Sequence, residues 1–425
     1  MLKYCVIIIF FYCTFTSQSQ SQSKIQDSVK TTRDSIKKVD FLKQLGNGYF
    51  PTKYINIDLR YLIKFNQYEG FRTGLGGTTN EDFSKKYRIN GYLVYGFRDH
   101  NYKYSIGGGF RIAPETNTWV NLSYTDDLQE TGSSAFLSDR RFFSFFEPRL
   151  LNIDLFHWHV TKAMNIEHQF SNTFLSELQL AVSDINPTYD YVFATNNTTY
   201  KEFRLTTAKI AFQWSPFSEF ENTKNGIFEK KVGYPKFTLQ YTKNFKNVLK
   251  SNVDFSKLDF RSIFQTKHKN SAISELIITG GLTNGNTPIT HMYHAYPNNI
   301  RKETIMQRFS VAGIKSFETM YFNEFFSDRF TTVQFKHFFN RFNITNRFKP
   351  QLVLITKYAI GNMDNIERHQ NISFNTLNKG YNESGFEINN LVLGFGLSFA
   401  YRYGAYHLPK LEDNVAFKFT FNVSF

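Results

Sequence analysis

Apolar and polar residues alternate without a break at the end of the chain, where residues 414–425 read N-V-A-F-K-F-T-F-N-V-S-F. Every second residue is Val or Phe, and the residues between them are mostly polar. Successive side chains of a β-strand point to opposite faces, so the pattern predicts a strand with one apolar face. The chain is therefore expected to finish on a strand whose last residue, Phe425, is aromatic.

The same alternation recurs from the beginning of the chain. In the first such segment, Ile55, Leu59 and Ile63 share one parity, and Asp58 and Arg60 share the other. We expect the three apolar residues to face lipid and the two charges to face inward. This period of two favours strands over helices. The predicted strands are residues 54–65, 70–77, 87–97, 103–112, 117–125, 163–171, 174–183, 202–214, 236–242, 255–266, 273–281, 328–339, 351–360, 383–389, 391–403 and 414–425.

Short turns join most of these segments, but two long excursions interrupt them, at about residues 126–161 and 284–326. Short turns on one side and long loops on the other are typical of a membrane-spanning barrel. The predicted fold class is all-β, a transmembrane antiparallel up-and-down β-barrel of about 16 strands, with 14 as the alternative. An even number places both termini in the periplasm and both excursions on the extracellular side. We expect the first excursion to lie outside the barrel or folded over its mouth.

The first residues have the features of a secretory signal peptide. Lys3 is followed by a short apolar core, and Ser17 and Ser19 form a small-x-small cleavage site. Both cysteines lie in this leader, so we expect a mature chain without disulfides or cysteine metal sites. The expected order is a signal peptide, a linker and an outer-membrane β-barrel, at residues 1–19, 20–48 and 49–425.

Composition fits a barrel rather than a helical membrane protein. The chain is 41% hydrophobic, with 48 Phe and 25 Tyr. Its mean hydropathy is −0.39, and no long apolar run follows the leader. Aromatic residues cover the lipid face and both interfacial girdles of membrane barrels. A large soluble β-sandwich is the alternative, but the aromatic excess and one-sided strands disfavour it.

The basic residues give a net charge of +14, but they are scattered rather than clustered. This distribution does not favour nucleic acid as a partner. The lipid A phosphates of lipopolysaccharide in an outer leaflet are a sufficient partner for a basic rim. We therefore expect outer-membrane lipid and lipopolysaccharide as partners, in the outer membrane of a Gram-negative bacterium.

Charges within or next to the predicted strands are the candidate functional residues. A charge that faces lipid near mid-bilayer costs about 2–4 kcal/mol, so barrel charges gather in the lumen or at the rims. They either form a salt-bridge network that stabilises the barrel or take part in gating and passage. The structural role is the simpler one. The candidate lumen or gating charges are Glu69, Arg72, Glu318, Glu324, Asp328 and Arg329.

No metal, cofactor or catalytic group is expected. His291 and His294 are spaced like metal ligands, but no third ligand lies at a suitable spacing. His157 and His159 share one strand face, which fits girdle or lumen packing. Outer-membrane lipid hydrolases pair a Ser with a His on the outer wall, and here no Ser–His pair stands out in the sequence.

Three segments carry a family resemblance: Q-Y-E-G-F-R-T-G-L-G-G-T-T-N, F-E-T-M-Y-F-N-E-F-F-S-D-R-F and E-S-G-F-E-I-N-N-L, beginning at Gln67, Phe317 and Glu383. They resemble the barrel family of unknown function that usually follows a carboxypeptidase regulatory-like domain. That family is distantly similar to the surface-antigen superfamily of outer-membrane assembly factors. The loop before the twelfth strand lacks the Arg-Gly-aromatic tip of insertases and secretion pores, since Lys302 follows Arg301.

These observations favour an integral outer-membrane barrel without enzymatic activity, which aids envelope assembly or the passage of envelope components. The resemblance implies that the barrel-assembly machinery inserts it by reading the last strand. The alternative is an outer-membrane lipid hydrolase. The two differ in whether one Ser→Ala or His→Ala change abolishes turnover of phospholipid or lipid A.

Overall fold

The computed structural model describes Phe41, Leu45 and residues 48–421, apart from short gaps inside that range. The expected signal peptide, most of the expected linker and Phe425 lie outside the described residues. The barrel lies in a compact unit that spans Gln44–Phe425. The gaps are residues 134, 142–147, 196–197, 224–225, 270, 305, 346–347 and 393.

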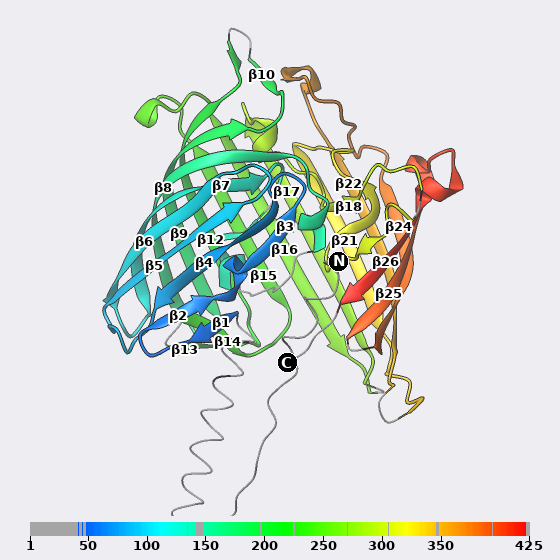
Figure 1. Cartoon of the computed structure of the whole chain (residues 1–425), viewed down its shortest axis with the longest axis horizontal. Coiled ribbons are helices and arrows are strands. Elements are labelled where there is room, and N and C mark those ends of the chain that lie inside the picture. Colours follow the sequence, from blue (N-terminus) through cyan, green and yellow to red (C-terminus); the bar gives the residue numbers. More distant parts are fainter. Residues whose placement is uncertain are drawn as a thin grey trace, which may run out of the picture. The chain divides into compact units, whose positions relative to one another are not determined.

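One sheet of 19 strands forms the wall (Figure 1), and the pairings described in it are antiparallel except that of β19 with β26. β1 and β19 are short additions, and β2 and β3 are halves of one strand, which leaves 16 wall strands of the 19. The all-β up-and-down barrel predicted by the sequence is confirmed, with 16 strands rather than 14. The wall strands are β2 Ile55–Asp58, β3 Ile63–Asn66, β4 Gly70–Thr79, β5 Tyr87–Gly96, β6 Tyr102–Ala113, β7 Thr118–Glu130, β8 Phe156–Ser171, β9 Phe174–Pro187, β12 Phe203–Trp214, β15 Lys236–Asn244, β16 Phe255–Lys267, β17 Ile273–Gly285, β21 Arg329–Phe338, β22 Gln351–Asn362, β24 Tyr381–Val392, β25 Phe395–Tyr403 and β26 Val415–Phe421.

The alternation of side chains gives the wall a polar inner face and an apolar outer face. On β16, Lys257, Asp259 and Arg261 are buried, whereas Leu258 and Phe260 between them are 37% and 38% exposed. No described part of the chain covers these outer residues, which is the pattern of a lipid-facing wall. The lumen is therefore the charged side of the barrel.

The first predicted strand is not continuous, because a 3-10 turn, η1 Leu59–Tyr61, separates β2 from β3. Asp58 starts the turn by accepting a hydrogen bond from the backbone N–H of Arg60 at 3.0 Å. Ile55 and Ile63 point outward, at 48% and 62% exposure, and Asp58 is buried, as the alternation predicts. Leu59 is only half-buried within the turn, so its expected strand position was wrong.

The turn also moves Tyr61 to the inner face. Its ring stacks on Tyr92 with the centroids 4.1 Å apart. A Cβ at Gly76 would lie 2.3 Å from the Tyr61 ring, so glycine is needed for the ring to lie there. A glycine in a strand often marks such a close approach.

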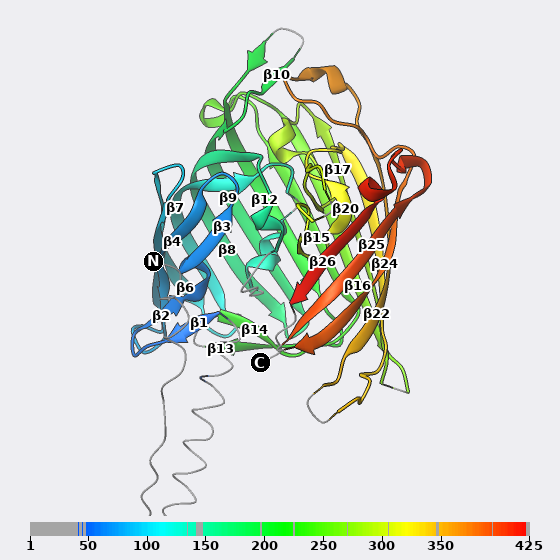
Figure 2. The same ribbon diagram turned by 45° about the vertical axis from the view of Figure 1, so that its right-hand side comes forward.

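Both long excursions fold into the barrel, where turns of the first are visible behind the front wall (Figure 2). The first spans residues 131–155, and the backbone N–H of Leu137 donates to Oε1 of Gln240 on the inner face of β15 at 2.9 Å. The second spans residues 286–328. The prediction that the first excursion lies outside the barrel or over its mouth is wrong, because polar contacts with the wall hold it inside. The second excursion, predicted on the extracellular side, is held inside in the same way. Their elements are η2 Leu137–Arg141, η3 Pro148–Leu151, η5 Ile289–His291, β18 Pro297–Asn299, β19 Ser310–Val311 and β20 Phe317–Tyr321.

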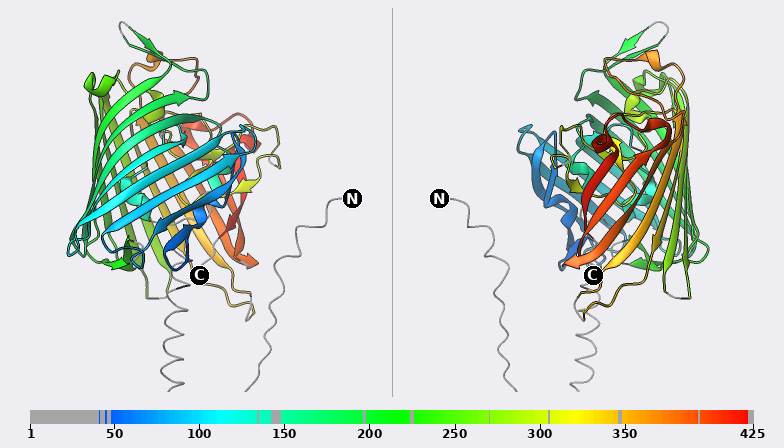
Figure 3. Two further views of the ribbon diagram at one scale, coloured as in Figure 1. Left: turned by 60° about the vertical axis from the view of Figure 1, so that its left-hand side comes forward. Right: turned by 90° about the vertical axis from the view of Figure 1, so that its right-hand side faces the viewer.

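The sheet does not close on itself. In the part of the chain that the structure describes, no pairing joins β26 to β2 or β3. Instead β19 runs parallel to β26, with Ser310 opposite Lys418 and Val311 opposite Phe419. Figure 3 shows the N-terminal strands and β26 on either side of this seam, with the second excursion between them.

Smaller elements cover the two ends of the barrel. β10, β11 and β23 form a three-stranded sheet above the end that carries the excursions, which we call the loop end (Figure 1). The hairpin β13–β14 lies at the opposite end, which we call the turn end. Among the described residues, no helix is long and apolar enough to cross a membrane. The remaining elements are β1 Tyr49–Pro51, β10 Val192–Ala194, β11 Thr199–Tyr200, β13 Glu219–Thr223, β14 Gly226–Lys231, β23 His369–Gln370, η4 Val248–Lys250, η6 Ile366–Arg368, η7 Gly404–Tyr406 and η8 Leu411–Asn414.

Candidate functional site in the lumen

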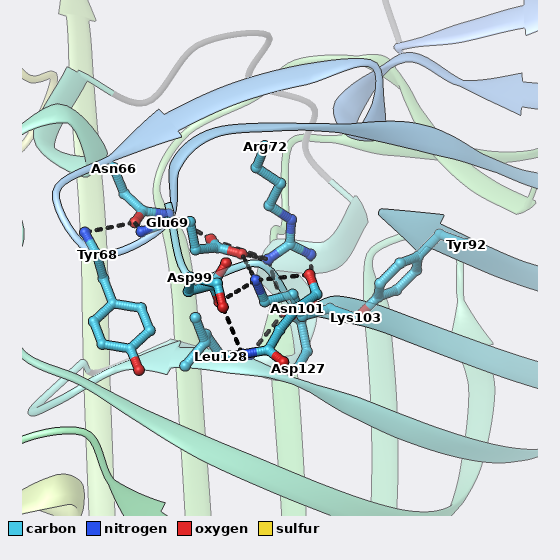
Figure 4. Close-up of polar contacts among 10 residues, drawn as sticks. All are labelled: Asn66, Tyr68, Glu69, Arg72, Tyr92, Asp99, Asn101, Lys103, Asp127 and Leu128. Atoms are coloured by element: carbon cyan, nitrogen blue, oxygen red, sulfur yellow. Dashed lines mark hydrogen bonds and ion pairs between the residues drawn. The ribbon is translucent and has the colours of Figure 1, made fainter. Parts of the chain in front are cut away.

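Two of the predicted charges, Glu69 and Arg72, lie together on the N-terminal wall (Figure 4). Arg72 forms two hydrogen bonds of 2.7 Å to the carboxylate of Asp127 and lies 3.4 Å from Glu69. Lys103 lies 2.7 Å from Glu69 and also pairs with Asp99. Three carboxylates and two cations therefore form one network across β4, β6, β7 and the turns between them.

The local sequence positions this network. The side-chain Oδ1 of Asn66 accepts hydrogen bonds from the backbone N–H groups of Tyr68 and Glu69, which shapes the turn between β3 and β4. Gly70 follows with a φ of 68°, a conformation that favours glycine. Lys103 is fully buried and Glu69 is 1% exposed. Buried charges of this kind require partners, and the turn provides them.

Glu318 and Glu324 belong to the second excursion and reach the C-terminal wall. Glu318 lies 3.2 Å from Nζ of Lys418 on β26. Glu324 forms two hydrogen bonds, of 2.7 and 3.1 Å, to the guanidinium of Arg402 on β25. All four side chains are buried. These two ion pairs fasten the excursion to the last two strands, which border the seam.

Asp328 and Arg329 do not reach the lumen. They lie where the second excursion meets β21, and Arg329 forms hydrogen bonds of 2.8 and 2.9 Å to Asp364 on a neighbouring loop. Arg329 and Asp364 are exposed, so the pair contributes little to stability. The six predicted charges thus fall into three separate places: the N-terminal wall, the second excursion and the rim of the loop end.

Sequence reasoning missed several ion pairs that hold the excursions. Arg261 of β16 forms hydrogen bonds to Asp139 of η2. Arg149 of η3 pairs with Glu130 at the end of β7, and its Nε donates to the carbonyl of Pro297 at 2.9 Å. The partners are separated by up to 148 residues, so spacing gives no signal for them. The two excursions therefore bind each other as well as the wall.

The histidines considered as metal ligands lie in different settings. His294 Nε2 is 2.6 Å from the carboxylate of Glu130, and His291 Nδ1 is 2.9 Å from the hydroxyl of Thr290. Burial lowers the pKa of His291 well below its usual value, so this residue is neutral. No group of three potential metal-binding side chains occurs among the described residues.

A contiguous apolar cluster closes the loop end above these polar contacts. Tyr191 and Phe193 next to the three-stranded sheet pack with Ile289 and Met292 of the second excursion and with Phe255 of the wall. The hydroxyl of Tyr191 accepts a hydrogen bond from the backbone N–H of Ile289 at 2.9 Å. The second excursion is therefore held at the loop end by this apolar cluster and inside the barrel by the ion pairs of Glu318 and Glu324. The excursions thus occupy the lumen.

Residues 47–374 match the family of unknown function DUF5686, in its C-terminal domain. The chain belongs to this family. The family resemblance predicted from the sequence is thereby confirmed, and the match covers most of the barrel. Among curated proteins, no match to this chain was found.

Two solved outer-membrane barrels are similar to this DUF5686 structure. BamA from Haemophilus ducreyi, without POTRA domains 1–3, is 9% identical with a TM-score of 0.51, and the match covers 86% of this chain and 69% of that one. CdiB from Acinetobacter baumannii is 12% identical with a TM-score of 0.43, over 86% of this chain and 59% of that one. At such low identity the likeness to BamA shows the fold, an outer-membrane β-barrel, and nothing more.

Proposed function

We propose that this DUF5686 protein is an integral barrel of the bacterial outer membrane, and that it aids the assembly or passage of envelope components at its seam. The observation that carries the proposal is the unpaired edge between β26 and the N-terminal strands. The lumen is filled by two excursions, whereas at the seam none of the described N-terminal strands pairs with β26, and β19 pairs with its edge. A route along the seam would displace β19, which pairs with β26 at Ser310 and Val311, whereas a route through the lumen would displace both excursions.

The contacts of β19 are few and local. The backbone N–H of Ala312 donates to the carbonyl of Phe419 at 2.7 Å, and the ring of Phe309 packs edge-on against Phe419. Arg308 forms hydrogen bonds to Asp413 and to the carbonyl of Glu412, at 2.9 and 3.0 Å. An uncovered strand edge readily pairs with another strand. A short loop segment thus occupies the position at which a strand of an envelope component would bind.

The proposed partners follow from this location. A basic chain with a net charge of +14 suits an outer leaflet rich in lipopolysaccharide phosphates. The barrel-assembly machinery would insert the chain, using the last strand. The location itself is tested by fractionation: the protein should sediment with outer membranes, resist carbonate extraction and shift in gels on heating. Recovery in the soluble periplasm would overturn the proposal.

A disulfide across the seam tests the role of the edge. Val311→Cys and Phe419→Cys lie side by side on β19 and β26, and the mature chain is expected to have no other cysteine. The oxidised variant should lose its ability to restore resistance to detergents and large antibiotics in a strain that lacks the protein, and reduction should restore it. We expect this loss because the lock keeps β19 on the edge.

The matched control is Leu397→Cys with Phe419→Cys, which joins β25 to β26 away from the seam. This second disulfide constrains the same strand without blocking its free edge, so function should persist in the oxidised form. If the oxidised Val311→Cys/Phe419→Cys protein restores resistance as well as the oxidised control, the edge of β26 is not required for function and the proposal is wrong.

A further inference from the structure

On the outer face of the barrel, the hydroxyl of Ser274 lies between two imidazole rings. Its Oγ is 2.8 Å from Nε2 of His268 and 2.9 Å from Nδ1 of His337. The two ring centroids are 5.7 Å apart, so both rings reach the same oxygen. A hydroxyl has one proton, which it donates to one imidazole while the other donates to it. Ser274 therefore has an imidazole acceptor within hydrogen-bond reach, as an activated serine nucleophile requires.

The strand register places this group on the lipid-facing side. Ser274 of β17 lies directly opposite His337 of β21, and Leu276 lies between Phe264 and Phe335 on the neighbouring strands. Paired residues share a face, and so do residues two apart. Phe264 and Phe335 are 37% and 39% exposed, which identifies this as the outer face. The Ser–His group therefore borders an apolar surface that faces lipid.

The Ser–His group lies at the turn end of the wall, and an end of a barrel wall is where the membrane interface lies. Ser274 is the second residue of β17, next to the short turn from which His268 projects at the turn end. The edge of the Phe339 ring packs on His337 at 4.7 Å and helps to fix that imidazole. The ester carbonyls of a phospholipid lie between its headgroup and its acyl chains. A lipid with its chains along Leu276 and Phe335 would bring an ester carbonyl to the hydroxyl.

We infer that Ser274 is the nucleophile of an acyl-ester hydrolase whose substrate is a phospholipid of the leaflet at the turn end. The inference rests on the membrane location proposed above. Ser274 Oγ bonds to the ester carbonyl carbon while its proton passes to His337. The bond from that carbon to the glycerol oxygen breaks, and the imidazolium returns the proton to the leaving oxygen. Water then hydrolyses the acyl-serine by the same route, which releases a fatty acid and restores the hydroxyl.

His268 has a different role from His337 in this scheme. It lies on the turn rather than on a strand. The scheme assigns the Nε2–H of His268 as the donor to Ser274 and Nδ1 of His337 as the acceptor, at the 2.8 and 2.9 Å contacts. Once Oγ is bonded to carbon, this N–H is available to the carbonyl oxygen, whose negative charge it stabilises. A donor aimed at that charge is the usual means of lowering the barrier for acyl transfer.

A second hydroxyl–imidazole pair on the outer wall provides a matched comparison. Thr118 Oγ1 lies 2.8 Å from Nδ1 of His168, and the ring of Phe170 packs on that histidine at 4.4 Å. Here the hydroxyl is secondary, has one imidazole instead of two and is shared with Thr116. We expect no hydrolysis at the Thr118–His168 pair. Substitution of Thr118 therefore shows whether the loss of any hydroxyl next to a histidine on the outer wall affects the assay.

The test uses the purified full-length protein in detergent micelles with a fluorophosphonate probe and with diacyl phospholipid. The probe should label Ser274, as located by peptide mass spectrometry, and the protein should release fatty acid. Ser274→Ala should abolish both. His337→Ala should lower turnover by about 10²–10⁴-fold, the usual contribution of a general base. Thr118→Ala should leave labelling and turnover unchanged.

The outcomes are separable from those of the location test. A barrel that shifts on heating and fractionates with outer membranes, yet is not labelled at Ser274, overturns the hydrolase and leaves the proposed location intact. Turnover that survives Ser274→Ala overturns it as well. His268→Ala refines the scheme: a loss smaller than that of His337→Ala supports the assigned roles, and the opposite order would exchange them and contradict His337 as the base.

Discussion

The buried cations Arg72 and Lys103 of the N-terminal wall are paired within that wall, whereas two buried cations of the C-terminal wall are paired with the excursion inside the barrel. Arg72 binds Asp127, and Lys103 binds Glu69, all on wall strands or their turns. By contrast, Arg402 and Lys418 bind Glu324 and Glu318 of the second excursion. Removal of the excursion would therefore leave the first group intact and would leave Arg402 and Lys418 without these carboxylates.

This difference connects the excursion to the seam. Arg402 and Lys418 lie on β25 and β26, the strands next to the unpaired edge. The same excursion provides β19, which covers that edge. Displacement of β19 is thus coupled to ion pairs that hold the C-terminal wall, whereas the N-terminal side of the seam has no such dependence in its Arg72 network. We expect the two sides to respond differently to substitutions.

The largest expected effect is that of Glu324→Ala. It leaves the buried guanidinium of Arg402 without its bidentate partner, and breaking a buried pair on one side costs about 3–5 kcal/mol. Urea unfolding of the heat-modifiable protein in detergent measures the loss. The double variant Glu324→Ala with Arg402→Leu should recover most of the free energy, because no buried charge remains unpaired. A double variant as unstable as the single one would refute this account of the pair.

Arginine substitutions on the outer face should not distinguish the two walls. Leu75 on β4 and Leu397 on β25 are 65% and 46% exposed on that face. If each lies near mid-bilayer, Leu75→Arg and Leu397→Arg should each lower stability in lipid vesicles by about 2–4 kcal/mol, because a charge is moved into lipid. A large difference between the two would mean that the contrast between the walls is not confined to the lumen.

Glu69→Ala should cost less than Glu324→Ala, although Glu69 is as deeply buried. Arg72 keeps both hydrogen bonds to Asp127, and Lys103 keeps Asp99. The loss should be about 1–3 kcal/mol, the cost of leaving single hydrogen-bond groups unsatisfied. The same urea assay measures it. If Glu69→Ala destabilises the protein as much as Glu324→Ala, the comparison between the two walls fails.

The sequence predicted the wall well and the lumen poorly, for physical reasons. Alternation is a local property, so β5 and β16 lie where their pattern predicts them. The break at η1 was missed because Leu59 and Tyr61 continue the alternating pattern, although their backbone forms a 3-10 turn that turns Tyr61 inward. The position of the excursions was missed because their sequences do not reveal that Asp139 faces Arg261, or that Glu324 faces Arg402.

The candidate residues show the same limit. The sequence identified Glu69 and Arg72 because alternation or loop position could direct these charges into the lumen. The Ser274 group was not identified because His337 is 63 residues away and joins Ser274 only through the pairing of β17 with β21. Asp328 and Arg329 were included with the lumen charges because alternation alone does not show where a strand leaves the membrane.

The smallest expected effect concerns the first excursion, which depends on the wall through Asp139. Burial raises the pKa of this carboxyl, but the hydrogen bonds and charge of Arg261 outweigh burial and hold it below its usual 3.8. A lowered pKa gives stability that is fully present above the usual value and is lost as the pH falls through the folded value. A cysteine at the buried Leu137 should therefore react faster with dithiodipyridine only below about pH 3.8. When Asp139→Asn is added to the Leu137→Cys protein, the cysteine should react faster at neutral pH than it does with Asp139 in place. Its reaction rate should then no longer rise in acid. A rate that depends equally on acid in both proteins would show that other carboxylates, rather than Asp139, hold the first excursion in the barrel.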